Sequence, residues 1–277
     1  MKDRALSASA AIAQVEEIVR GGANEKDVAY FKEHRGRFER TLRRMTELAP
    51  PPAKVLDIGS HYLHLSLALR AMDYHVVSID APAFADQPLM RARAQKGGID
   101  NLAVGRLEDG DFLQEEGESF DVVVFTEIME HITFNPVLLW RRVYDLLRVG
   151  GFVYITTPNS LTPWKMLHVL KRMTTLAGVG VSPDEIMHTV TYGHHWKEYS
   201  ADEIRKYFAL MSPDFSVEIA HFNEDWKTAP PDASIKSACR AFVRGLAANI
   251  PVLRDQIEAI VRVQGRTRWL IEPPGFI

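Results

Sequence analysis

The stretch "KVLDIGSHYLHLSLALRAM", residues 54–72, changes its residue pattern part-way along. Its first part, "KVLDIG", is a short apolar run, and such a run predicts a strand that is covered on both faces. Its second part, "LHLSLALRAM", carries leucine and alanine at helical spacing and predicts a helix. A strand followed at once by a helix is the first half of a βαβ unit, which favours a parallel sheet.

The same alternation continues down the chain. Further short apolar runs predict strands, and the stretches between them predict helices. Alternation of this kind favours an α/β fold with a doubly wound, mostly parallel sheet. The further strand candidates are "HVVSID" (75–80), "NLAVG" (101–105), "FDVVVF" (120–125) and "GGFVYITTP" (150–158).

Breaks in this pattern predict the domain organisation. Residues 1–49 read as N-terminal helices that pack on the core, and residues 50–277 read as the main domain. Helical insertions are expected near 160–196 and 224–264. The first is long for a connection, which favours a lid or substrate wall, and the second predicts a cap or the interface of a homodimer. Apolar side chains that would line a pocket or build a satellite core in the first insertion are Trp164, Met166, Met173 and Met187.

Composition narrows the class of protein. A formal net charge of −3 supplies no basic field for nucleic acid or an anionic membrane, so a nucleic-acid partner is not expected. Cys239 is the only cysteine, which excludes an internal disulfide and a cysteine-based metal cluster and suits a reducing cytoplasm. No segment reaches the roughly 20 apolar residues of a membrane span. A cytoplasmic protein without a membrane span is therefore expected.

Polar residues stand where the predicted strands end. In a doubly wound sheet the ligand binds beyond the carboxyl ends of the strands. Asp57 and Gly59 end the first strand, and Asp80 ends the second. A carboxylate at the position of Asp80 can accept both hydroxyls of a ribose, and a glycine lets the backbone approach a ligand closely. The alternative for Asp80 is a helix N-cap.

The stretch "FTEIMEHI", residues 125–132, follows the predicted strand at 120–125. Glu127, Glu130 and His131 are spaced so that they would share one face of a helix. Two carboxylates and an imidazole are costly to bury without compensation. The spacing alone is compatible with a metal site, with an acid/base site or with a solvated helix start.

Taken together, these segments resemble class I S-adenosylmethionine-dependent methyltransferases, closest to the branch of ubiquinone-biosynthesis O-methyltransferases. The resemblance implies a Rossmann-like sheet of seven strands with a reversed last strand, whose final strands would be "FSVEIAHF" (215–222) and "RTRWLIEP" (266–273). It implies that Gly59 lies under the methionine part of the cofactor, that Asp80 holds the ribose and that Asp57 organises the turn from beneath. The remaining cofactor contacts implied by the resemblance are Leu107 and Glu108 near adenine and Thr126 near the methionine ammonium.

One departure from the family pattern affects the cofactor site. The glycine-rich turn usually reads Asp-x-Gly-x-Gly-x-Gly, and here His61 and Leu63 stand at the second and third glycines. A β-carbon removes the freedom to adopt positive φ, so either the loop takes another path or cofactor affinity is reduced. The same residues disfavour a nicotinamide dehydrogenase, which needs Gly-x-Gly-x-x-Gly next to a pyrophosphate.

The pattern Glu-x-x-Glu-His is also similar to one in small-RNA 3′-terminal 2′-O-methyltransferases. That resemblance implies a divalent metal held by Glu127, Glu130, His131 and a later histidine, for which His195 fits and His194 competes. Two carboxylates and two imidazoles suit Mn²⁺, Fe²⁺, Zn²⁺ or Co²⁺ better than Mg²⁺. In a second interpretation, Glu130 orients His131, and His131 or His195 is a general base without a metal. In a third interpretation these residues are structural.

The function expected from these features is methyl transfer from S-adenosylmethionine to an oxygen of a small-molecule acceptor, with His131, His195 and Glu130 as catalytic residues. Two alternatives remain open at this point. The metal pattern permits an RNA 3′-end 2′-O-methyltransferase, although the chain lacks a basic surface signal. The substitutions at His61 and Leu63 permit a non-catalytic S-adenosylmethionine-binding protein.

Overall fold

A computed structural model of the chain describes residues 6–22, 24–176, 180–223, 245 and 249–275. The chain divides into two compact units. The first unit contains residues 6–124 and 139–152, and the second contains the other described residues. The strands of the sheet belong to both units.

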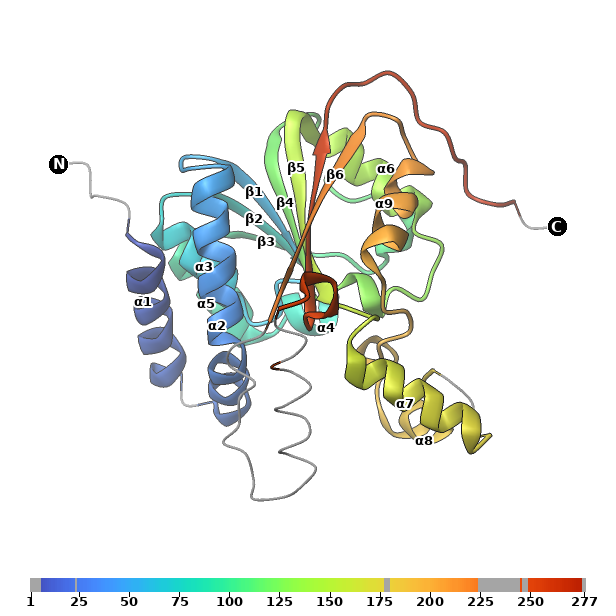
Figure 1. The fold of residues 1–277 in the computed structure, drawn as a ribbon. Helices are drawn as coiled ribbons and strands as arrows, with labels where there is room; N and C mark the ends of the chain where they lie inside the picture. Colours follow the sequence, from blue (N-terminus) through green and yellow to red (C-terminus); the bar gives the residue numbers. More distant parts are fainter. Residues whose placement is uncertain (1–5, 23, 177–179, 224–244, 246–248, 276–277) are drawn as a thin grey trace. The chain divides into compact units, whose positions relative to one another are not determined.

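A seven-stranded sheet has the strand order β3-β2-β1-β4-β5-β7-β6 (Figure 1). The pairs β1–β2, β1–β4 and β2–β3 are parallel, whereas β6 and β7 are antiparallel. The chain order reverses between β1 and β4, which is the switch point of a doubly wound sheet. This confirms the predicted fold class. The strands are β1 (Lys54–Ile58), β2 (His75–Asp80), β3 (Asp100–Ala103), β4 (Phe120–Thr126), β5 (Leu147–Pro158), β6 (Phe215–Phe222) and β7 (Gln256–Val263).

The last strand differs from the prediction. The segment 266–273 is not a strand, and β7 lies ten residues earlier in the chain, at Gln256–Val263. All but one of the residues of β7 are buried. Its apolar residues nevertheless recur at every second position, which is a strand signal that the prediction of a helical insertion over 224–264 does not take into account. These residues are Ile257, Ala259, Val261 and Val263. Residues 224–244 and 246–248 of the predicted helical insertion lie outside the described residues.

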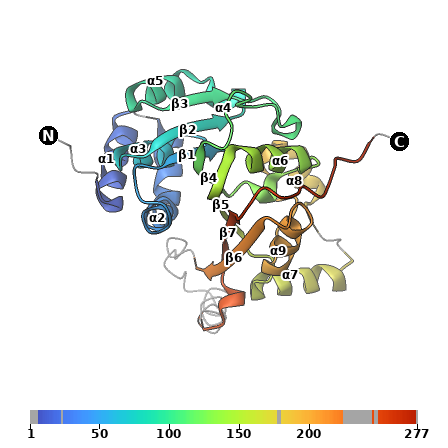
Figure 2. The same cartoon turned by 90° about the horizontal axis from the view of Figure 1, so that it is seen from above.

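Helices of the first unit cover the parallel strands. Helices α1, α2 and α3 contact one another, and α4 and α5 contact β3 (Figure 2). The N-cap side chains of Ser7 and Asn24 accept backbone N–H groups at the starts of α1 and α2. The helices are α1 (Ala8–Gly21), α2 (Glu25–Leu48), α3 (His64–Ala71), α4 (Pro82–Ala85) and α5 (Pro88–Gly97), followed by α6 (Val137–Leu146), whose first two residues belong to the second unit.

Helices of the second unit are α7 (Pro163–Thr174), α8 (Pro183–His188) and α9 (Ala201–Ala209). The alternative that the large apolar residues of α7 and α8 form a satellite core is wrong for the described residues, whereas the alternative that they line a pocket stays a prediction. Trp164 is 45% exposed, Met166 53%, Met173 61% and Met187 79%. An amphipathic pattern is the same whether or not another element covers its apolar face, so the sequence could not show this.

A buried ion cluster fixes α2 to α3 and α5. Asp27, which is fully buried, accepts hydrogen bonds from His64 Nε2 at 2.7 Å and from both terminal nitrogens of Arg93. Burial alone would raise the pKa of Asp27, but the His64 and Arg93 hydrogen bonds outweigh burial and lower it. The carboxylate is therefore charged in the folded protein at neutral pH, and its partners compensate it.

We expect Asp27→Ala to lower the free energy of unfolding by about 3–5 kcal/mol, because it leaves a guanidinium buried without its counter-charge. Urea denaturation at pH 7 measures this loss. The control is Asp86→Ala, whose carboxylate and Arg91 partner have side chains 48% and 68% exposed, and which should cost less than about 1 kcal/mol. Equal losses in the two variants would contradict the proposed role of the buried cluster.

Candidate functional site

The turn from β1 to α3 adopts left-handed backbone at alternate residues. Gly59 has φ 75°, His61 φ 47° and Leu63 φ 62°. These are the positions of the three glycines in the family's turn. The turn therefore has the positive-φ conformation that glycine favours, although residues with side chains occupy two of the three positions. A reduced cofactor affinity stays a prediction.

Local contacts offset the strain of this turn. A left-handed residue with a β-carbon costs about 1–2 kcal/mol. The side chain of Leu63 is fully buried, and burying a leucine contributes about 1.5–3 kcal/mol. The backbone N–H of His61 donates to Asp80 Oδ2 at 2.6 Å. These contacts depend on the tertiary structure, which explains why the turn can be built without glycine.

Asp80 stands at the carboxyl end of β2, as predicted. Its Oδ2 accepts from His61 N and its Oδ1 accepts from Ala81 N at 2.7 Å. Helix α4 begins at Pro82 with Ala81 as N-cap and no side-chain cap, so Asp80 is not an N-cap residue. Burial raises the pKa of Asp80 and the two N–H donors oppose this rise without cancelling it. Because a carboxylate has about four lone-pair sites, two remain for ligand hydroxyls.

Asp57 lies beneath the turn and is buried. It accepts a hydrogen bond from Ser66 Oγ at 2.5 Å, so it links the end of β1 to α3. Burial, with a smaller contribution from the charge of Asp80, raises the pKa of Asp57 to about 6. These contacts suit the organising role that the resemblance implied.

The other predicted cofactor residues lie in different places. Leu107 and Glu108 lie in the short 3₁₀ helix η1 (Leu107–Asp109) of the first unit, where Glu108 pairs with Arg106 at 3.4 Å. Thr126 ends β4 and belongs to the second unit. The joint contact of these residues with one cofactor stays a prediction.

We expect Asp80→Ala to weaken the binding of S-adenosylhomocysteine by roughly ten- to hundredfold, since a hydrogen bond to a charged group contributes about 1.5–3 kcal/mol. Isothermal titration calorimetry at pH 7.5 measures the dissociation constant. Asp86→Ala serves as the control because Asp86 is exposed and forms an ion pair with Arg91, which is also exposed. Unchanged binding by the Asp80 variant would remove this carboxylate from the cofactor site.

Asp57 also predicts a pH dependence of stability. The pKa of its carboxyl is raised from 3.8 to about 6 on folding, so the folded protein binds a proton that the unfolded chain releases between about pH 4 and pH 6. Its contribution to stability is therefore fully present below pH 4 and falls as the pH rises to 6. Relative to the wild type, Asp57→Asn should gain on the order of 2–3 kcal/mol between pH 4 and pH 7. Denaturation of both proteins at the two pH values tests this, and a difference that does not change with pH would contradict it.

The end of β4 leads into a second group of polar residues, in the second unit. Glu127 has a positive φ of 55°, and its N–H donates to Thr156 O at 2.8 Å. A 3₁₀ helix, η2, then covers only Met129–His131. The prediction that Glu127, Glu130 and His131 share one face of an α-helix is therefore wrong, because the left-handed residue and its hydrogen bond to β5 delay the helical turn.

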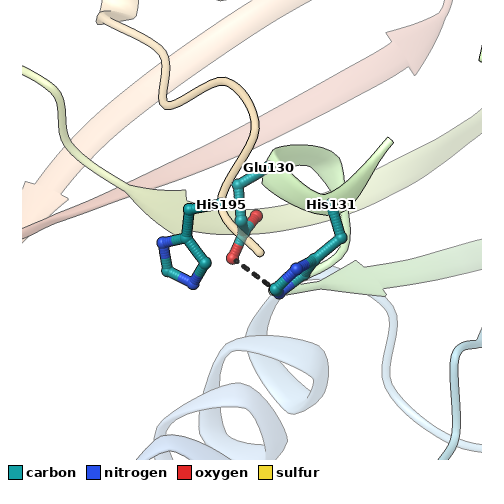
Figure 3. Close-up of side chains that lie close together, drawn as sticks. All are labelled: Glu130, His131 and His195. Carbon is teal, nitrogen blue, oxygen red and sulfur yellow. Dashed lines mark ion pairs between the residues drawn. The ribbon is translucent and has the colours of Figure 1, made fainter. Parts of the chain in front are cut away.

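Three of the predicted ligands nonetheless come together. One ligand atom from each of Glu130, His131 and His195 lies within 4.8 Å of the others (Figure 3). Glu130 is fully buried. Its Oε2 accepts from Thr157 Oγ1 at 2.9 Å, whereas its buried Oε1 has no hydrogen-bond partner among the described residues. Burial first and the charge of Glu127 second raise the pKa of Glu130 to about 8.

The two imidazoles are held in different ways. His131 Nδ1 lies 2.9 Å from the carbonyl oxygen of His194, and because a carbonyl only accepts, Nδ1 carries the proton and Nε2 carries the lone pair. Nε2 lies 3.9 Å from Glu130 Oε1. His195 Nδ1 lies 3.1 Å from Glu198, whose carboxylate also pairs with Lys165 at 2.7 Å. Burial lowers the pKa of His131, and the Glu198 hydrogen bond raises that of His195.

Two predicted ligands are not part of this group. Glu127 accepts a hydrogen bond from Thr156 Oγ1 at 2.9 Å and is not in the cluster. His194 contributes its carbonyl oxygen rather than its ring, which packs 5.2 Å from the ring of Trp196. Between the adjacent histidines, the structure thus places the ring of His195 in the cluster. Thr157 was not predicted, although a pair of threonines at the end of an apolar strand is a signal of a polar site.

The chain matches the family described as methyltransferase domain over residues 30–211, which is more than half of its length. It belongs to this family. Family membership supports S-adenosylmethionine as the cofactor, and the positive-φ turn with the buried hydroxyl of Ser60, which has no partner among the described residues, fits such a ligand. The second resemblance, to RNA methyltransferases, is not tested by this match.

Curated relatives of the chain are also methyltransferases. The chain is 34% identical over 124 residues to a ubiquinone biosynthesis O-methyltransferase of Ruegeria pomeroyi, covering 45% of this chain and 48% of the relative. It is 29% identical over 153 residues to the protein of the same name from Neisseria meningitidis, covering 53% and 58%. The chain thus spans about half the length of the curated relatives it matches.

Solved structures support the fold alone. The PH0226 protein of Pyrococcus horikoshii superposes with a TM-score of 0.53 at 14% identity, covering 83% of this chain and 91% of the other. A SAM-dependent methyltransferase of Thermotoga maritima gives a TM-score of 0.50 at 14% identity, covering 92% and 100%. Within the described residues, no helix is long and apolar enough to cross a membrane.

Proposed function

We propose that this protein transfers a methyl group from S-adenosylmethionine to an oxygen of a small molecule. Membership in the methyltransferase family supports the transfer, and the curated relatives named ubiquinone biosynthesis O-methyltransferase support oxygen as the acceptor. The observation that carries the proposal is the group of Glu130, His131 and His195. Methylation of a hydroxyl requires removal of its proton, and these side chains are of the kind that do so.

The first unit would hold the cofactor. Asp80 would accept the ribose hydroxyls, and the turn at Gly59 would let the backbone approach the ligand. When bound, the cofactor supplies an electrophilic methyl group on a sulfonium, which needs no activation by the protein. The contribution of the chain is then to align the two reactants and to remove the acceptor proton.

His131 is suited to receive that proton. Its Nδ1–H is held by the carbonyl oxygen of His194, so the lone pair of Nε2 has a fixed direction. Burial lowers the pKa of His131, which keeps the ring neutral and able to accept a proton at neutral pH. His195 is oriented by Glu198, and Lys165 holds Glu198 in turn. The two rings lie 4.9 Å apart, so both can address one acceptor group.

A divalent cation also fits this group. Glu130 Oε1 is buried without a hydrogen-bond partner among the described residues, and a buried carboxylate oxygen of this kind needs a cation or a proton. One carboxylate and two imidazoles suit Mn²⁺, Fe²⁺, Zn²⁺ or Co²⁺. The hydrogen bonds of His131 to a carbonyl and of His195 to a carboxylate are typical supports of metal-ligating histidines. Glu130, His131 and His195 would hold the ion, which would lower the pKa of an acceptor hydroxyl.

We expect protein purified without chelator to contain a divalent metal, and Glu130→Gln, His131→Ala and His195→Ala each to lower its occupancy at least tenfold. Mass-spectrometric metal analysis measures occupancy, and transfer of labelled methyl from S-adenosylmethionine to small molecules of a cell extract measures activity. His188→Ala is the matched control, because the side chain of His188 is 75% exposed on α8 and contacts Asp184 of the same helix.

The outcomes distinguish a metal site from a general base that acts without a metal. If no metal is found and activity survives exhaustive chelation, the metal is excluded, and loss of activity in the His131 variant then identifies a general base. If the Glu130, His131 and His195 variants retain both metal and activity, these three residues have no functional role.

A further inference from the structure

The end of β5 carries two adjacent threonines that are both buried. Thr156 is 1% exposed and Thr157 is fully buried. A buried hydroxyl is costly unless it is hydrogen-bonded, and valine, which has the same shape, would fill either position without that cost. Thr156 Oγ1 donates to Glu127 Oε1 at 2.9 Å, and Thr157 Oγ1 donates to Glu130 Oε2 at 2.9 Å. Each hydroxyl therefore holds one of the two glutamates that follow β4.

The two threonines keep these glutamates apart. Successive side chains of a strand point to opposite faces of the sheet, so the hydroxyls of Thr156 and Thr157 lie on different sides of β5. The carbonyl oxygen of Thr156 also accepts the N–H of Glu127 at 2.8 Å, so Glu127 is attached to β5 through its backbone as well as its side chain. Glu127 is outside the cluster, whereas Glu130 belongs to it. All four residues lie in the second unit.

The hydrogen bond from Thr157 decides which oxygen of Glu130 faces the imidazoles. A glutamate carboxylate can turn about its last side-chain bond and present either oxygen. With Oε2 held by Thr157, Oε1 lies 3.9 Å from His131 Nε2 (Figure 3). Oε1 is buried and has no hydrogen-bond partner among the described residues. A cation that lies about 2 Å from each of its ligand atoms fits between an oxygen and a nitrogen at this distance, so Oε1 is the oxygen that can bind it.

We propose that Thr157 is the positioning residue of the cluster: it holds Glu130 so that Oε1 is directed at His131 and His195 and binds a divalent cation together with them. Thr157 acts through Glu130 and contacts neither the ion nor the methyl acceptor. Loss of a partner that orients a metal ligand typically costs about 10- to 100-fold in metal affinity or activity. The inference rests on the proposed function, because it assigns a role within the same site, and it does not depend on the identity of the acceptor.

Titration of the metal-free full chain with Co²⁺, followed by visible absorption, tests this role. Thr157→Val keeps the shape of the side chain and removes the donor, so we expect it to bind Co²⁺ about 10- to 100-fold more weakly than the wild type. Thr157→Ser keeps the hydroxyl and should bind Co²⁺ with an affinity close to that of the wild type. Thr156→Val is the matched control and should keep the wild-type affinity, because Thr156 is similarly buried and loses the same kind of hydrogen bond, but to Glu127. A loss of packing alone would affect both valine variants alike.

Several results would overturn the inference. Wild-type Co²⁺ affinity in Thr157→Val would show that the hydroxyl is not needed, and an equal loss in Thr156→Val would show a general effect of disturbing β5. A loss in Thr157→Ser as large as that in Thr157→Val would show that the shape of the side chain matters rather than its hydroxyl. If Thr157→Val does not fold, Thr157→Ala is compared with Thr157→Ser in the same way. Loss of affinity in Glu130→Gln with none in Thr157→Val refutes only the role of Thr157, whereas a wild type that binds no Co²⁺ refutes the metal site itself and this role with it.

Discussion

The carboxylate of Asp80 is the interaction on which the first unit's site depends. It receives the N–H of His61 on one oxygen and that of Ala81 on the other, and so it joins the turn after β1 to the end of β2. Without this anchor the left-handed residue His61 would lose the hydrogen bond that offsets its conformational cost. One carboxylate therefore both fixes the backbone of the turn and retains lone pairs for a ligand. Burying a charge is costly, and here the same charge serves both roles.

Much of the fold could be predicted from the sequence because apolar runs and helical spacing are local signals. The strand candidates after residue 54 correspond to β1 to β5, and Asp57 and Asp80 lie where the predicted strands end. The prediction of a strand at 266–273 is wrong because it assigns residues 256–263, whose apolar side chains recur at every second position, to a helical insertion. The exposure of α7 could not be predicted, because an amphipathic pattern does not show whether a partner covers the apolar face.

The residues of the candidate site could be predicted from the sequence, but their arrangement in space could not. The residue types of the cluster are visible in the sequence, yet the left-handed conformation of Glu127 removes it from the face it would share with Glu130 and His131. That conformation is stabilised by the hydrogen bond from Glu127 N to Thr156 O, a residue on another strand. The turn at His61 and Leu63 shows the same limit, since its strain is offset by Asp80 and by burial in the core. In both places a tertiary contact overrides the local preference of the residue.

The buried acidic residues differ in whether both of their carboxylate oxygens are hydrogen-bonded. Both oxygens of Asp27 are bonded, by His64 and Arg93, and both oxygens of Asp214 are bonded, in part by Thr267. Glu130, equally buried, has one oxygen bonded and one without a partner among the described residues. A group whose role is to hold the fold gains nothing from an unpaired atom, because such an atom costs about 1–3 kcal/mol. The unpaired oxygen of Glu130 therefore favours a cluster kept for a ligand over one kept for stability.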